Sequence, residues 1–143
     1  MSDYTKNLLR WIAVLPGSLL AGFLATFPLH LMLYLAFANN GTLLGFIELP
    51  AGSNVSMEYF LYPFIIALVF IYVGFEIAPK HKLKTAVILA VLYLLFIIGS
   101  VILGLQNNIE MSFEVRTLGP IIGLLIGLFF VSQKSKIKDK NER

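Results

Sequence analysis

The feature that most limits how this chain can fold is a long interval without positive charge. Between Arg10 and Lys80 the sequence contains no lysine or arginine, and its only acidic residues there are glutamates 48, 58 and 76. A helix that faces water needs a polar side, so apolar stretches of this length belong in a lipid bilayer. Only 13% of the residues are charged, whereas a soluble domain has about 25%. The sequence therefore predicts an integral membrane protein.

Four apolar segments are candidates for crossing the membrane, because a helix needs about 20 apolar residues to span the hydrocarbon core. They cover approximately residues 17–37, 59–78, 85–105 and 117–132. The segments between them are too short to hold a second core in a chain of 143 residues. We predict an all-α integral membrane protein, a four-transmembrane-helix bundle in which residues 1–143 form a single membrane domain.

The first apolar region, residues 8–37, is too long for one upright span, because its 30 residues measure about 45 Å as a helix. We predict a short interfacial helix over residues 4–14, then a break or bend at Pro16 and Gly17, where the first span begins. One long, tilted helix is the alternative. A cleavable signal peptide is a weaker alternative, since the apolar run continues well past the candidate cleavage site.

The basic residues gather on one side of the predicted bundle. When both termini and the 79–84 loop are placed in the cytoplasm, ten of the eleven lysines and arginines lie on that side, and only Arg116 lies outside. Cytoplasmic segments carry the excess of lysine and arginine in membrane proteins. We therefore predict that the N- and C-termini are cytoplasmic. The chain lacks cysteine and its composition is typical of bacteria, so we predict a multi-pass protein of the bacterial plasma membrane.

The tail after the fourth span, residues 133–143, carries alternating lysines and is predicted to form neither a helix face nor a folded unit. Each lysine near an anionic leaflet adds about 1 kcal/mol of attraction. We predict that the tail binds the anionic inner leaflet, and no nucleic acid partner is indicated, because the basic residues lie at membrane edges. The lysines of the tail are Lys134, Lys136, Lys138 and Lys140.

The predicted outer loop, residues 38–57, is the only sizeable segment outside the bilayer. Its stretches NNG and PAGSN have turn chemistry. The segment TLLGFIEL between them is expected to lie flat on the membrane as a short amphipathic piece. Two glycosylation tripeptides, at Asn40 and Asn54, are interpreted as chance matches. The loop is a candidate surface for contact with a partner.

Small residues recur at every fourth position in the first and fourth predicted spans. Helices in a bilayer associate through close backbone contact, which small residues permit. We predict that spans one and four are tight neighbours inside a compact bundle; an interface with a partner or a homo-oligomer is the alternative. These packing residues are Gly17, Ala21, Gly22 and Ala25 in the first span and Gly119, Gly123 and Gly127 in the fourth.

A line of polar residues along the first span is the main candidate for a polar path or a binding site. Its members are Ser18, Thr26, His30 and Tyr34. An ionisable residue inside a membrane is a candidate for proton transfer or anion binding. The alternative is structural: neutral His30 donates a hydrogen bond to a carbonyl freed by Pro28, or to Tyr93 or Ser100 of the third span.

Two charged residues at the predicted membrane edges complete the candidate sites. Glu76 lies four residues before Lys80, the favourable order for a helical ion pair. It is predicted to be a paired or solvated interfacial residue, with a gating or coupling role as the alternative. Arg116 is expected to form an interfacial salt bridge, with Glu110 and Glu114 close in sequence and Glu58 at the start of the second span; the alternative is an anion-attracting mouth.

The sequence contains none of the patterns that we would connect with catalysis. We find no HExxH or CxxC motif, no phosphate-binding loop and no Ser/His/Asp set at a plausible depth, so no enzyme, cofactor or metal site is predicted. The leading hypothesis is an accessory, immunity or assembly subunit that acts through helix packing. The alternative is an oligomeric translocator of a small solute, an ion or protons with His30 on its path, and a lipid-handling protein is a third class.

Overall fold

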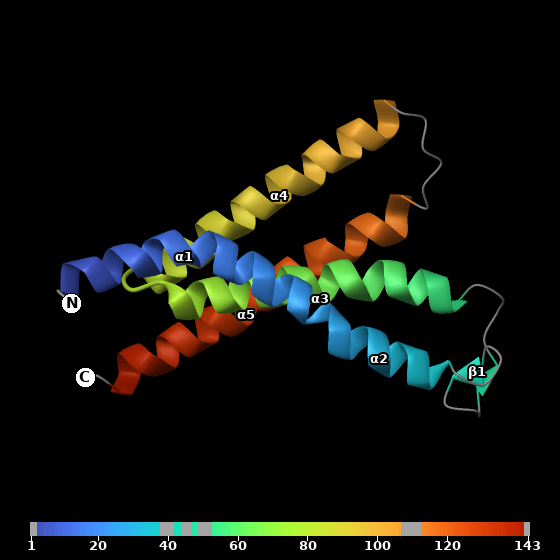
Figure 1. Ribbon diagram of the computed structural model, residues 1–143, viewed down its shortest axis with the longest axis horizontal. Helices are drawn as coiled ribbons and strands as arrows, with labels where there is room; N and C mark the ends of the chain where they lie inside the picture. The colour runs from blue at the N-terminus through green and yellow to red at the C-terminus, as the bar shows by residue number, and fades with distance from the viewer. Residues whose placement is uncertain (1–2, 38–41, 44–46, 49–52, 107–112, 142–143) are drawn as a thin grey trace.

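The computed structural model describes residues 3–37, 42–43, 47–48, 53–106 and 113–141. The described residues form helices, one short pair of strands and the turns that connect them (Figure 1). Its elements are α1 (Asp3–Leu24), α2 (Thr26–Ala36), β1 (Thr42–Leu43), β2 (Ile47–Glu48), α3 (Ser53–Ile77), α4 (Lys82–Gln106) and α5 (Phe113–Asn141).

Four helical segments are long and apolar enough to cross a membrane. They are Tyr4–Ala36, Ser56–Ile77, Lys82–Gly104 and Thr117–Ile137. Lipid demands that a spanning segment satisfies its own backbone hydrogen bonds, which a helix does. The predicted all-α class and the number of spans are therefore confirmed, and the chain is a multi-pass membrane protein by length and composition.

The first apolar region differs from the predicted division at Pro16. Helix α1 continues through Pro16, and Figure 1 shows it curving along its length. The helix is interrupted only at Ala25, between α1 and α2. Pro28 explains this position, because it lacks an N–H for the carbonyl of Leu24 and its ring crowds that carbonyl. The segment predicted as an interfacial helix, residues 4–14, is the beginning of α1 and has no boundary of its own.

Helix α3 lies at the centre of the fold. It makes its most extensive contacts with α5, then with α1, and packs less extensively on α4. Among the described residues, α1 and α5 make few or no direct contacts with each other. The prediction that spans one and four are tight neighbours is therefore wrong, because α3 provides the opposing surface for both.

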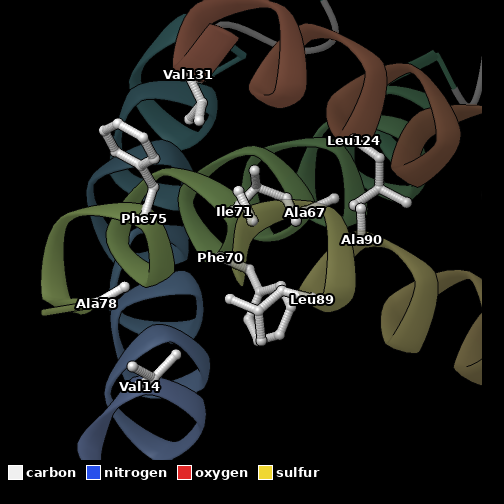
Figure 2. Packing of buried hydrophobic residues seen from close by; sticks show 11 residues of the cluster. Val14, Ala67, Phe70, Ile71, Phe75, Ala78, Leu89, Ala90, Leu124 and Val131 are labelled. Atoms are coloured by element: carbon white, nitrogen blue, oxygen red, sulfur yellow. The ribbon is translucent and has the colours of Figure 1, made fainter. Parts of the chain in front are cut away.

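The core is small and consists of side chains that these four helices direct at one another (Figure 2). Ala67, Phe70 and Ile71 of α3 are almost completely buried. Around them lie Val14 of α1, Leu89 and Ala90 of α4, and Leu124 and Val131 of α5. Most other large apolar side chains point away from the bundle, as expected where lipid replaces water.

The turn between α3 and α4, the start of α1 and the end of α5 lie at the same end of the molecule (Figure 1). We call this the basic end, because the turn and the adjoining helix carry Lys80, Lys82 and Lys84. Pro79 follows the end of α3, and His81 has a positive φ of 50°. The Thr85 hydroxyl donates to the His81 carbonyl at 3.3 Å, so this side chain secures the first turn of α4.

Two expectations about the segments beside the spans are corrected. The tail was expected to be unfolded, but α5 continues to Asn141, and residues 128–141 contain no proline or glycine that would end it. The piece TLLGFIEL was expected to be amphipathic and flat. Its ends form β1 and β2 instead, an antiparallel pair with Thr42 opposite Glu48. Most of the rest of the predicted outer loop lies outside the described residues.

Candidate functional site

The glycine row of α5 packs directly on the backbone of α3. A Cβ atom added at Gly119 or Gly123 would overlap a carbonyl oxygen of α3, and one added at Gly127 would lie 3.4 Å from the next carbonyl along. The glycines and the residues whose carbonyls they approach are Gly119 with Phe60, Gly123 with Phe64 and Gly127 with Leu68. Both series advance by four, so the helices run in the same direction with one continuous line of backbone contact.

The small residues of α1 contact a different set of α3 residues. A Cβ atom added at Gly22 would lie 3.1 Å from the carbonyl oxygen of Ile66, and one at Gly17 would lie 2.9 Å from the side chain of Ile77. Ala21 and Ala25 are partly buried on the same side of the helix. The predicted packing role of these rows thus corresponds to contacts within the chain, with α3 as the shared neighbour.

Helix α4 also carries glycines, but they have no neighbour among the described residues. A Cβ atom added at Gly99 or Gly104 would meet nothing within 4 Å. The hydroxyl of Ser100 donates to the Phe96 carbonyl of its own helix at 2.9 Å, and the side chain is exposed. Figure 1 shows the later part of α4 diverging from α3 and α5. Ser100 and Gly104, four residues apart, lie on one row of α4, which we call the free glycine face.

The predicted polar line of the first span does not form a connected network. Ser18 is completely buried, and its hydroxyl donates to the carbonyls of Val14 at 2.6 Å and Leu15 at 3.0 Å. The Thr26 hydroxyl donates to the carbonyl of Phe23 at 2.7 Å. Both hydroxyls are therefore satisfied by carbonyls three or four residues earlier in the chain. The side chain of Tyr34 is exposed at the far end of α2.

His30 is the member of the line that bonds to another helix. Its Nδ1 forms a hydrogen bond with the hydroxyl of Tyr62 on α3, and the ring centroids are 6.1 Å apart. The suggested partners on the third span, Tyr93 and Ser100, are therefore wrong. No pattern in the sequence indicates Tyr62, because the partner depends on how α2 and α3 are aligned.

Glu76 connects three helices at the basic end. Its carboxylate binds Lys134 of α5 and lies 3.7 Å from the ammonium nitrogen of Lys82, the first residue of α4. Lys82 also donates to the Glu76 backbone carbonyl at 3.2 Å. The expected pairing with Lys80 is not the one observed, because α3 ends at Ile77 before it reaches that residue.

Two aromatic rings lie beside the lysines that pair with Glu76. The Lys134 ammonium donates to the Tyr72 hydroxyl at 3.0 Å and lies 5.0 Å from the centre of the Tyr72 ring. The Lys82 ammonium lies 5.4 Å from the centre of the Phe75 ring. Both distances are within the range of cation–π attraction. We call Tyr72, Glu76, Lys82 and Lys134 the Glu76 cluster. Glu76 is therefore paired, with Lys134 and Lys82, and its position at a membrane edge stays a prediction.

The remaining predicted site residues have side chains outside the described part of the structure. These are Arg116, near the start of α5, and Lys138 and Lys140, near its end. Among the described residues, no group of three histidine, aspartate or glutamate side chains is placed to hold a metal ion.

Comparison with known proteins identifies no relative. The chain matches no family model, no curated protein and no solved structure. Function must therefore be inferred from the contacts described above.

Proposed function

We propose that this protein is a non-enzymatic membrane subunit of the accessory, immunity or assembly type, which acts by packing a helix against another transmembrane helix. The observation that carries the proposal is the difference between its glycine rows. Those of α1 and α5 are occupied by α3, whereas Gly99 and Gly104 of α4 approach no described residue. Glycine lowers helix stability, so glycines that meet no neighbour among the described residues fit contact with a further helix.

The proposed setting is the bacterial plasma membrane, with both termini in the cytoplasm. The basic end carries Lys80, Lys82 and Lys84 together with Lys134, and the start of α1 and the end of α5 lie there. Retention of positive charge in the cytoplasm supports this orientation. The lysines of α5 then lie near the anionic inner leaflet. No cofactor or nucleic acid is part of the proposal.

The absence of cysteine from the chain allows a direct test by single-cysteine crosslinking in native membranes. Ser100→Cys places a thiol on the free glycine face, and Leu24→Cys, on an exposed position of α1, is the control. The proposal predicts a disulfide-linked product of defined mass from Ser100→Cys only, either a dimer or a complex with one second protein. Adding Gly104→Leu should remove the product while the protein remains folded. Equal crosslinking at both positions, or none at Ser100→Cys, would contradict the proposal.

A translocator of a small solute, an ion or protons is the second candidate. The observation that favours it is the hydrogen bond between His30 and Tyr62, because it places an ionisable group between two spans. The hydroxyls of Ser18 and Thr26 bond to nearby backbone carbonyls, so they do not continue a polar path from this pair toward the basic end. Flux measurements on reconstituted protein distinguish this candidate from the packing subunit.

A further inference from the structure

The Glu76 cluster carries more positive than negative charge. Two ammonium groups, from Lys82 and Lys134, share the single carboxylate of Glu76. The cluster therefore has a net charge of +1. An ion pair at a membrane edge needs only one lysine, so the second cation is left without a matching charge inside the cluster.

The two ammonium groups also retain hydrogen-bonding capacity. Each lysine has three N–H donors. Lys134 directs donors at the Glu76 carboxylate and the Tyr72 hydroxyl, and 50% of its side chain is exposed. The side chain of Lys82 is 34% exposed. Both side chains are therefore partly open to an anion approaching from outside the bundle while Glu76 stays bound.

The position of the cluster matches the depth of lipid headgroups. The apolar span of α3 ends at Ile77, directly after Glu76. Lys80 and Lys84 are exposed on the neighbouring turn and the start of α4, and the positive end of the α4 dipole lies beside them. The aromatic rings of Tyr72 and Phe75 contact the two ammonium groups from the side of the bundle.

We propose that the Glu76 cluster binds the phosphate of an anionic lipid headgroup. Phosphate oxygens accept hydrogen bonds from the free donors of Lys82 and Lys134, and the acyl chains lie along the apolar surface of the bundle. Glu76 neutralises part of the charge of the two lysines and so competes with the phosphate for them. This site does not depend on the proposed packing function, which concerns the opposite half of α4.

The test is the shift in unfolding temperature of the purified full-length protein in mild detergent. The added probes are phosphatidylglycerol, phosphatidylcholine with the same acyl chains, and inorganic phosphate. Phosphatidylglycerol should raise the unfolding temperature, and the other two should leave it unchanged. A shift with phosphatidylcholine shows acyl-chain binding without headgroup recognition, and a shift with inorganic phosphate alone assigns the site to the free ion. Either result overturns the lipid assignment.

Variants separate this site from a purely structural ion pair. Lys82→Gln and Lys134→Gln should each abolish most of the phosphatidylglycerol shift, whereas Lys136→Gln, the same charge change on the other side of α5, should retain it. Glu76→Gln is the sharpest variant, because it removes the competing carboxylate. It should lower the unfolding temperature without lipid and enlarge the shift with phosphatidylglycerol. A reduced shift in Glu76→Gln, or an undiminished shift in both lysine variants, would overturn the proposal.

Discussion

Gly123 of α5 lies so close to the carbonyl oxygen of Phe64 on α3 that a Cβ atom would overlap it. A backbone atom moves less readily than the end of a flexible side chain. The contact therefore fixes the distance between the two helices that form the most extensive interface of the fold. An alanine substitution at Gly123, compared with one at a glycine that has no close neighbour, therefore tests this helix contact.

We expect Gly123→Ala to destabilise the protein by about 1–3 kcal/mol, the usual cost of overpacking a well-packed interface. Gly104→Ala is the matched control, because its added methyl group meets nothing within 4 Å. Alanine is favoured over glycine in a helix by up to about 1 kcal/mol, so the control should be neutral or stabilising. Unfolding in detergent measures both. Similar effects of the two substitutions would show that α5 does not pack on α3 in this way.

The hydrogen bond between His30 and Tyr62 should contribute a measurable coupling between α2 and α3. Side-chain hydrogen bonds between transmembrane helices average about 0.6 kcal/mol in double-mutant cycles. We expect a coupling of this size from His30→Phe, Tyr62→Phe and the double variant, measured by unfolding in detergent. Additive effects within error would mean that the two side chains do not interact.

A flux experiment separates the two candidate functions through the same histidine. In liposomes of defined composition, a translocator with His30 on its path should lose a pH-dependent flux in His30→Ala. A packing subunit should show no flux above protein-free liposomes, with or without the substitution. A pH-dependent flux that requires His30 would therefore replace the packing proposal with the translocator.

The two lysines nearest to Glu76 in the sequence should differ in their effect on stability. Lys82→Gln removes a cation 3.7 Å from the carboxylate, and because the pair is partly exposed we expect a loss of at most about 1 kcal/mol. Lys80→Gln should have no effect, since Lys80 is exposed beyond the end of α3. Thermal unfolding of both variants measures these changes in stability. A larger loss from Lys80→Gln would restore the pairing expected from sequence spacing.

The sequence was sufficient to predict the number of spans, because an interval of 69 residues without lysine or arginine between Arg10 and Lys80 has few other physical explanations. It also located small residues that make close contacts, such as Gly22 and Gly123. It did not reveal that both face α3, since a small-residue row shows that a neighbour comes close but does not identify which helix it is.

Other contacts escaped sequence analysis for the same reason. The partners of His30 and Glu76 come from other helices, 32 and 58 residues away for Tyr62 and Lys134. Spacing along one helix therefore led to Lys80 instead of Lys134. The tail was misjudged because its alternating lysines show no amphipathic pattern, yet they are good helix formers and extend a helix that is already anchored on α3.

The orientation of the chain in the bilayer is the claim on which the proposals depend, and single-cysteine labelling in intact cells tests it most directly. An impermeant thiol reagent should label Asn54→Cys, at the start of α3, without permeabilisation. It should label Lys80→Cys, in the turn at the basic end, only after the membrane is opened. Labelling of both residues from the same side would contradict a chain that crosses the membrane between them, and with it the depth assigned to every contact described above.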